Sequence, residues 1–162
     1  MRHIINLEVE NQAGVLARIA GLFSARGFSI ESISAGKALP NETVPMTLVV
    51  HGDDLIIEQV KKQLNKLIDV IRVTDVTQAK NNFVSREVLL VKVACSPAKR
   101  VEITQLINIF GAKVVDISSK SIGLELTGLQ DKIDAFLNTL QPYGIKEMVR
   151  TGTVAMLRDF SS

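Results

Sequence analysis

The sequence predicts an α+β protein of two βαββαβ units in tandem, each with a four-stranded antiparallel sheet and two helices on one face. A first set of residues recurs at an offset of 84: Gly27, Ile30, Ile33 and Ser34 match Gly111, Val114, Ile117 and Ser118. A second set recurs at an offset of 76: Gly52, Ile57, Val60 and Leu64 match Gly128, Ile133, Phe136 and Leu140. A repeat of this length indicates two domains of one fold, and an extra loop over residues 37–44 explains the difference between the offsets.

The first strand and the first helix follow from hydrophobic spacing. At His3–Glu10, Ile5, Leu7 and Val9 alternate with other residues, so one face of a strand looks inward. The stretch Asn11–Gly14 breaks this strand. A helix follows, in which Gly27 acts as a C-terminal stop and five apolar residues have helical spacing: Val15, Leu16, Ile19, Leu22 and Phe23.

The remainder of the first unit contains two strands, a helix and a closing strand. We expect strands over Phe28–Ala35 and Met46–His51, separated by a loop with Gly36, Pro40, Asn41 and Pro45. Gly52-Asp53-Asp54 predicts a turn with a helix cap. The helix Leu55–Leu67 then places its apolar residues inward, and Val70–Val76 closes the unit: the inward residues are Ile56, Ile57, Val60, Leu64 and Leu67.

The second half repeats this order after a short linker over residues 78–84. Ser96-Pro97 opens its first helix with a cap and a first-turn proline. The expected elements are strand Arg86–Cys95, helix Ala98–Phe110, strands Lys113–Ser118 and Ser121–Leu126, helix Asp131–Leu140 and strand Lys146–Leu157. This order is the ferredoxin-like plan, in which the sheet face without helices is either covered by other groups or exposed to solvent. The predicted domains are residues 1–77 and 85–162.

Composition excludes several classes of function. The net charge is only +2, Lys and Arg form no stripe, and one Tyr and six Phe leave little for base stacking, so we expect no nucleic-acid partner. The single Cys95 cannot form an internal disulfide, which suits a reducing compartment. The charged N-terminus does not read as a signal peptide, and no apolar run reaches about 18–20 residues. We therefore expect a cytoplasmic protein without a membrane partner.

The turn Asn11–Leu16 is the candidate ligand site. Asn11 can cap the following helix, and Gly14 allows close approach of the backbone to another group. Free amides at a helix start favour a carboxylate or phosphate by about 0.3–1 kcal/mol in water and up to about 2 when partly buried. The corresponding turn of the second unit, Ser96–Arg100, has a proline where an amide would help and two cations after it. This difference indicates that only the first turn binds a ligand.

Two longer stretches resemble a known family. Val9-Glu10-Asn11-Gln12-Ala13-Gly14-Val15-Leu16-Ala17-Arg18 and Gly21-Leu22-Phe23-Ser24-Ala25-Arg26-Gly27-Phe28-Ser29-Ile30-Glu31-Ser32-Ile33 are similar to the start of the regulatory small subunit of acetolactate synthase, also called acetohydroxyacid synthase. That start is an ACT domain, an amino-acid-sensing form of the βαββαβ plan. The resemblance extends over the whole length and includes residues 86–93.

The resemblance implies a non-catalytic protein that activates a separate catalytic large subunit and makes it sensitive to valine or another branched-chain amino acid. It also implies that thiamine diphosphate, Mg²⁺ and FAD belong to that large subunit, and that this chain has no cofactor of its own. Two ACT domains would pair as a homodimer with the effector between them. The implied effector contacts are Asn11, Gln12, Ala13, Gly14, Val15 and Leu16 of one chain, with Ser29 and Ile30 of the other.

One residue departs from the family pattern, because Ser29 stands where the family usually has Asn. A hydroxyl replaces a two-ended amide, and losing a hydrogen bond to a charged ligand costs about 1.5–3 kcal/mol unless water or the hydroxyl substitutes. We expect the site to persist, with its affinity and its choice among branched-chain amino acids left open.

Three other functions are alternatives to a regulatory subunit. The closest is a free-standing ACT-type amino-acid sensor acting on a different enzyme or regulator. An RNA-binding domain of the same topology would need aromatic residues on its middle strands, and Val88–Val93 has none. A small hydrolase would need Arg18 and Asn11 at a phosphate-binding turn. His3 and His51 have no neighbours at metal-ligand spacing, and Glu31 is expected to pair with a cation.

Overall fold

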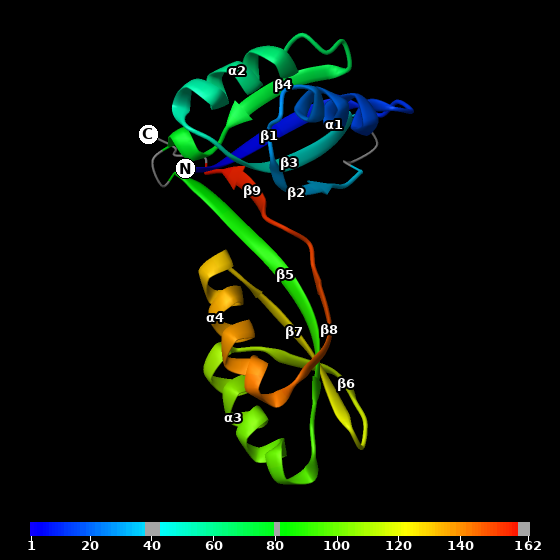
Figure 1. Cartoon of the computed structure of the whole chain (residues 1–162), viewed down its shortest axis with the longest axis vertical. Helices are drawn as coiled ribbons and strands as arrows, with labels where there is room; N and C mark the ends of the chain where they lie inside the picture. The colour runs from blue at the N-terminus through cyan, green and yellow to red at the C-terminus, as the bar shows by residue number, and fades with distance from the viewer. Residues whose placement is uncertain (38–42, 80–81, 159–162) are drawn as a thin grey trace. The chain divides into compact units, whose positions relative to one another are not determined.

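A computed structural model describes residues 1–37, 43–79 and 82–158. The chain divides into two compact units, one formed by Met1–Ser85 together with the stretch from Gly152 onward, and one formed by Arg86–Thr151 (Figure 1). The sequence had assigned everything from residue 85 to the second domain. Residues 152–158 instead belong to the first unit.

The first unit has the predicted order of elements. These are β1 (Arg2–Glu10), α1 (Val15–Ala25), β2 (Ile30–Ala35), β3 (Thr43–His51), α2 (Asp54–Leu64) and β4 (Val70–Asp75), followed by a short 3₁₀ helix, η1 (Thr77–Ala79). Its antiparallel strands are ordered β2-β3-β1-β4, and both helices lie on one face. The ferredoxin-like prediction is confirmed, with β2 at an edge. Pro45, predicted in a loop, lies in β3 at an exposed position.

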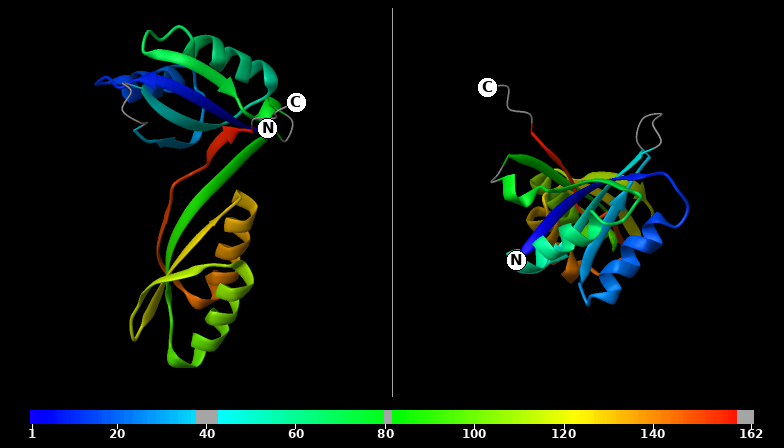
Figure 2. Two further views of the ribbon diagram at one scale, coloured as in Figure 1. Left: turned by 180° about the vertical axis from the view of Figure 1, so that it is seen from behind. Right: turned by 90° about the horizontal axis from the view of Figure 1, so that it is seen from above.

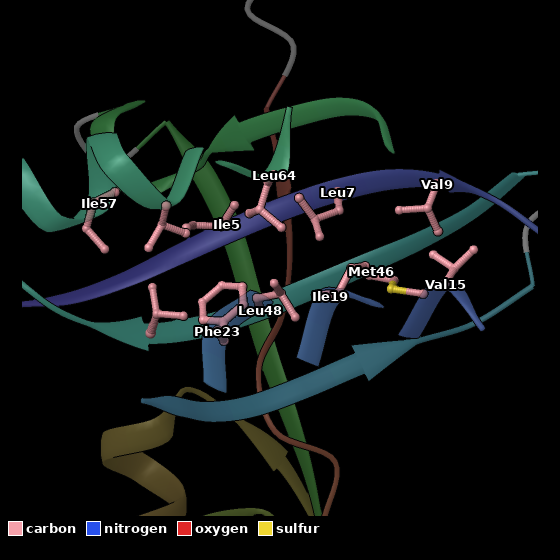
Figure 3. Packing of buried hydrophobic residues seen from close by; sticks show 12 residues of the cluster. Ile5, Leu7, Val9, Val15, Ile19, Phe23, Met46, Leu48, Ile57 and Leu64 are labelled. Carbon is pink, nitrogen blue, oxygen red and sulfur yellow. The ribbon is translucent and has the colours of Figure 1, made fainter. Parts of the chain in front are cut away.

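The core of the first unit lies between the sheet and the two helices (Figure 3). The predicted alternation on β1 is confirmed, because Ile5, Leu7 and Val9 are all buried. They contact residues of β3, α1 and α2, chiefly Met46, Leu48, Val50, Val15, Ile19, Phe23, Ile57, Val60 and Leu64. Leu16 was also predicted to face inward, but 49% of it is exposed. The buried stripe of α1 repeats every fourth residue from Val15, and Leu16 lies one residue to its side.

Two helix ends match the sequence prediction. Asp53 precedes α2, and its side chain accepts a hydrogen bond from the Ile56 backbone N–H at 2.8 Å, as an N-cap does. Gly27 follows the end of α1 with φ of 68°, a left-handed conformation that favours glycine. These local signals fix where α2 begins and where α1 ends.

The second unit repeats the same plan. It contains β5 (Phe83–Ala94), α3 (Arg100–Phe110), β6 (Lys113–Ile117), β7 (Ser121–Gly128), α4 (Gln130–Leu140) and β8 (Ile145–Arg150), with 3₁₀ turns η2 (Pro97–Lys99) and η3 (Gln141–Tyr143). Its strands are ordered β6-β7-β5-β8. Cys95 is buried, as expected for a small apolar residue. β5 begins at Phe83, inside the stretch predicted as a linker.

The predicted last strand, Lys146–Leu157, is two strands. β8 ends at Arg150, and β9 (Val154–Leu157) pairs with β5 as a fifth strand. Between them lies Gly152, whose φ of 74° turns the backbone in a way that other residues rarely adopt. The strand predicted from the sequence runs through this glycine without a break. We call residues 152–157 the return segment, because they follow the second unit and belong to the first.

The return segment covers the face of the first sheet that the helices leave open. In the two views of the molecule, β9 lies beside β1 (Figures 1 and 2). Ala155 packs against a small buried cluster of Ile4, Val49 and Val76. The Asn6 side chain donates to the Ala155 carbonyl oxygen at 2.8 Å. This face of the sheet is therefore covered by residues 154–157 of the same chain.

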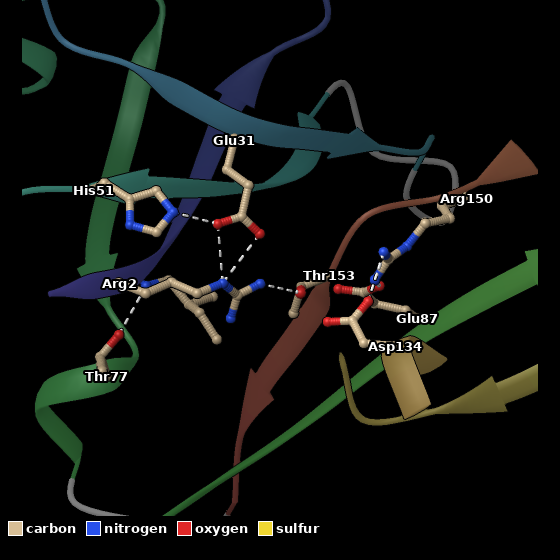
Figure 4. A network of polar contacts seen from close by, with 9 residues as sticks. Arg2, Glu31, His51, Thr77, Glu87, Asp134, Arg150 and Thr153 are labelled. Carbon is tan, nitrogen blue, oxygen red and sulfur yellow. Dashed lines mark hydrogen bonds and ion pairs between the residues drawn. The ribbon is translucent and has the colours of Figure 1, made fainter. Parts of the chain in front are cut away.

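A polar network fastens the start of the return segment to the sheet (Figure 4). Arg2 Nε donates to the two carboxylate oxygens of Glu31 at 3.1 and 3.2 Å, and Arg2 Nη2 donates to Thr153 Oγ1 at 2.7 Å. His51 Nε2 contacts the same carboxylate. Burial alone would raise the pKa of Glu31, but hydrogen bonds from His51 and Arg2 outweigh it and lower that pKa. Glu31 thus pairs with a cation, as predicted.

Replacing Phe23 by Ala should destabilise the first unit by about 3–5 kcal/mol, because a fully buried ring leaves a cavity between α1 and the sheet. Urea unfolding followed by circular dichroism measures the loss. Leu55→Ala is the matched control, since Leu55 on α2 is 72% exposed and its truncation should change the unfolding free energy by less than about 0.5 kcal/mol. Equal effects of the two substitutions would contradict this packing.

Glu31→Gln should destabilise the fold in a pH-dependent way. The pKa of Glu31 is lowered from its ordinary value of 4.5, so its charge stabilises the folded chain above that value. This stabilisation is lost as the pH falls through the lowered pKa. The melting temperatures of wild type and variant should differ at about pH 7 and converge near about pH 3. Glu58→Gln, which removes an exposed pair with Lys62, should have little effect at about pH 7. A gap independent of pH would rule out this role of the Glu31 charge.

Candidate functional site

The candidate turn connects β1 to α1. Asn11, Gln12, Ala13 and Gly14 are exposed, whereas Val15 is buried in the core. The predicted cap by Asn11 is wrong. The helix begins at Val15, and its N-cap position is held by Gly14, with φ of 87° and no side-chain hydrogen bond. Asn11 precedes that position by three residues and does not cap the helix.

The absence of a cap leaves backbone amides available. Gln12 N–H donates to the Glu10 carbonyl at 2.9 Å, and Val15 N–H makes only a long bond of 3.4 Å to the Gln12 carbonyl. Within the described ranges, the N–H groups of Ala13, Gly14, Leu16 and Ala17 have no acceptor. Such amides carry partial positive charge and bind anionic groups.

Gly14 is held in place by a neighbouring ion pair. A Cβ atom at this position would lie 3.1 Å from Arg18 Nη1. Arg18 Nε in turn donates to Asp69 Oδ2 at 2.7 Å, and the Asp69 side chain is only 7% exposed. The sequence suggested that Arg18 faces solvent or a partner. Its pairing was missed because Asp69 is 51 residues away in the chain and no local pattern connects the two.

Ser29 and Ile30 lie far from this turn within one chain. Ile30 is opposite Val50 on β3, next to the end of the sheet where Arg2 pairs with His51. The turn follows Glu10, which pairs with Thr43 at the other end of the same strands. A single chain therefore does not bring together the two halves of the predicted pocket, and a pocket made of both needs a second copy of the chain.

A hollow of about 580 Å³ lies beside the turn. In the described part of the chain it is lined by Glu10, Asn11, Gln12, Thr43 and Ile71. It therefore includes the first two of the predicted effector residues. Half of Ile71 is exposed, so the hollow has an apolar patch next to polar groups. This combination suits a small molecule with an ionic end and a short apolar side chain.

The corresponding turn of the second unit differs, as the sequence predicted. Pro97 occupies the start of η2 and contributes no N–H. The Arg100 side chain donates to the Ser118 carbonyl at 3.4 Å, and Lys99 lies 5.6 Å from the centre of the Tyr143 ring. Burial and a hydrogen bond to Glu102 raise the pKa of Tyr143. This turn therefore begins with a proline, and its two cations contact Ser118 and Tyr143 of the same unit.

Across residues 1–37, 43–79 and 82–158, no group of three or more His, Cys, Asp or Glu side chains is arranged to hold a metal ion. In the same ranges no helix has the length and apolar character required to cross a membrane.

Comparison with known proteins identifies both units. Residues 5–72 match the ACT domain of small subunits of acetohydroxyacid synthase, and residues 86–159 match the family described as the small subunit of acetolactate synthase. A probable acetolactate synthase small subunit of Archaeoglobus fulgidus is 51% identical over 98% of both chains. The acetolactate synthase small subunit of Bacillus subtilis is 47% identical over 98% of this chain and 91% of its own.

A solved structure agrees with these matches. The crystal structure of an acetolactate synthase small subunit from Thermotoga maritima superimposes with a TM-score of 0.91, at 39% identity over 99% of each chain. The tandem α+β architecture and the resemblance found in the sequence are thereby confirmed. From its two matched domains, its full-length relatives and its fold, this chain belongs to the family of acetolactate synthase small subunits.

Proposed function

We propose that this chain is the regulatory subunit of acetolactate synthase, which activates the catalytic large subunit and makes it subject to feedback inhibition by a branched-chain amino acid. The observation that carries the proposal is the uncapped start of α1, where four N–H groups lack an acceptor within the described ranges. The chain itself is non-catalytic and has no cofactor of its own. Thiamine diphosphate, Mg²⁺ and FAD are held by the large subunit.

The free amides suit the carboxylate of an amino acid. The turn supplies donors from Ala13 and Gly14, and the first turn of α1 supplies those of Leu16 and Ala17. An apolar side chain of valine size contributes roughly 1.5–3 kcal/mol when buried. One methylene more or less changes binding by only about 1–3 kcal/mol, so valine is the first effector to test, and leucine and isoleucine are its nearest competitors.

A homodimer through the first unit would complete the pocket. β2 is an edge strand, and exposed edges tend to be covered by another chain. If two β2 strands pair antiparallel about a two-fold axis, the start of one strand lies near the end of the other. Ala35 at the end of β2 aligns with Met46 and Leu7, toward the end of the sheet that carries the turn. Ser29 and Ile30 of the second copy would thus approach the turn of the first.

Inhibition follows if the effector favours one of two conformations of the dimer. A ligand shifts such an equilibrium only by the difference between its affinities for the two states. The effector must therefore bind more tightly to the conformation in which the holoenzyme is less active. By reciprocity, the catalytic subunit must change the affinity of this chain for the effector.

A free-standing amino-acid sensor would bind the same effector at the same turn. It would act on another enzyme or regulator, and it would not associate with the large subunit. Co-purification of the chain with a subunit that binds thiamine diphosphate and FAD supports the regulatory subunit. A stable effector complex without such association would favour the sensor.

Gly14→Asp should abolish inhibition by valine while activation of the catalytic subunit persists. The new carboxylate would face the carboxylate of the effector, and a side chain at φ of 87° is strained. The measurement is the turnover of the catalytic subunit with and without this chain, over a titration with each branched-chain amino acid. Gly21→Asp is the matched control on the same helix, because a Cβ atom there has no neighbour within 4 Å in the described structure. Inhibition that survives in Gly14→Asp would overturn the assignment of the site.

A further inference from the structure

The return segment makes direct contact with the strand that carries the second half of the proposed effector site. We propose that this segment transmits effector binding at β2 to the second unit, with Arg2, Gly152 and Thr153 as positioning residues. This inference rests on the proposed function and concerns how the effector signal leaves its site. Three sets of contacts support it.

The first contact is between Gly152 and β2. A Cβ atom on Gly152 would lie 2.6 Å from the Cβ atom of Ser32 and 2.8 Å from its Oγ, so the backbone of Gly152 rests on Ser32 without room for a methyl group. Ser32 follows the proposed contact residue Ile30 by two positions on β2. A shift of this strand therefore displaces Gly152.

The second contact is the chain of hydrogen bonds from Glu31 through Arg2 to Thr153 (Figure 4). Glu31 directly follows Ile30, and both of its carboxylate oxygens accept from Arg2 Nε. The Arg2 guanidinium also donates to Thr153, which is only 3% exposed. His51 holds Glu31 from β3. A guanidinium is planar and rigid, and it holds both hydrogen bonds. A movement of Glu31 therefore also displaces Thr153.

The third set of contacts holds the preceding residues within the second unit. Thr151 N–H donates to the Val88 carbonyl, and Val88 N–H donates to Thr151 Oγ1, both at 3.1 Å. Arg150 donates to Glu87 at 2.7 Å and to Asp134 at 2.8 Å, and Glu87 is 3% exposed. Residues 150 and 151 are therefore fixed to the second unit, and residues 152 and 153 to the first. The peptide between Thr151 and Gly152 joins the two sets of contacts.

The chain passes between the units a second time, along β5. That strand pairs with β9 near its start, where Arg158 N–H donates to the Asn82 carbonyl at 3.0 Å and Arg158 Nε donates to the Phe83 carbonyl at 3.3 Å. β5 runs from Phe83 to Ala94, and its strand partners are β7, β8 and β9. The return segment contacts β2 through Gly152, which lies against Ser32.

The test compares substitutions of Thr153 in the full chain, assembled with the catalytic subunit. Thr153→Val keeps the shape of the side chain but removes the oxygen that accepts from Arg2, whereas Thr153→Ser keeps that oxygen. We expect Thr153→Val to bind valine as wild type does in calorimetry and to activate the catalytic subunit normally. Its inhibition by valine should weaken at least about 5-fold, the lower end of ordinary allosteric coupling. Thr153→Ser should retain wild-type inhibition.

A second readout separates coupling from stability. In wild type, the catalytic subunit should change the affinity of the chain for valine, and in Thr153→Val this change should shrink by the same factor. Gly152→Ala and Arg2→Gln test the other two positions and serve as alternatives if Thr153→Val unfolds. Lys62→Ala is the control, since it removes an exposed ion pair with Glu58 on α2 and should leave the coupling unchanged.

Three outcomes are decisive. Loss of inhibition with intact binding in Thr153→Val, and its retention in Thr153→Ser, support the transmission by the return segment. Wild-type inhibition in folded Thr153→Val, Gly152→Ala and Arg2→Gln overturns it while leaving the effector site in place. If wild type itself neither binds nor responds to any branched-chain amino acid, the proposed function fails, and the inference fails with it.

Discussion

The structure depends on the start of α1, a helix that has no side-chain cap. A side-chain cap stabilises a helix start by roughly 1 kcal/mol, and α1 forgoes it. Gly14 makes this possible, since its positive φ turns the chain into the helix without a side chain over the amides. The ion pair of Arg18 with the buried carboxylate of Asp69 holds the first turn of α1 in place. Donors fixed in this way are ready for a carboxylate, because little ordering remains to be done when it binds.

The two copies of the fold differ at the turn that precedes the first helix of each unit. In the second unit, the corresponding turn has a proline without an N–H, and the side chains of Lys99 and Arg100 contact Tyr143 and Ser118. The first unit in turn has its open sheet face covered by β9, a strand that comes after the second unit in the chain. The first unit thus has a turn with free backbone amides, and its sheet is covered by a strand that follows the second unit in the chain.

Most elements could be predicted from the sequence because their signals are local. The alternation of Ile5, Leu7 and Val9 defines the inner face of β1, and Asp53 and Gly27 define helix ends through contacts within a few residues. The order of strands then follows from the ferredoxin-like plan. The eight predicted effector residues rest largely on resemblance and on the local chemistry of the turn, and they stay a prediction.

The features that the sequence does not predict depend mostly on contacts between residues far apart in the chain. Arg18 finds Asp69 across 51 positions, and Arg2 finds Thr153 across 151. The break at Gly152 is not predicted because the glycine is required by its contact with Ser32, a residue far away in the chain. The cap assigned to Asn11 was wrong because the helix starts later than the Asn suggests. For Arg18, Arg2 and Gly152, the deciding partner lies outside the local pattern.

The most direct test of the central claim observes the amides themselves. In a nitrogen–proton NMR titration of the isotope-labelled chain with valine, the backbone resonances of Ala13, Gly14, Leu16 and Ala17 should shift together and saturate. Their amide hydrogens should also exchange more slowly with solvent once the effector is bound. Saturable binding of valine that leaves these four amides unchanged would show that the uncapped helix start is not where the effector is held.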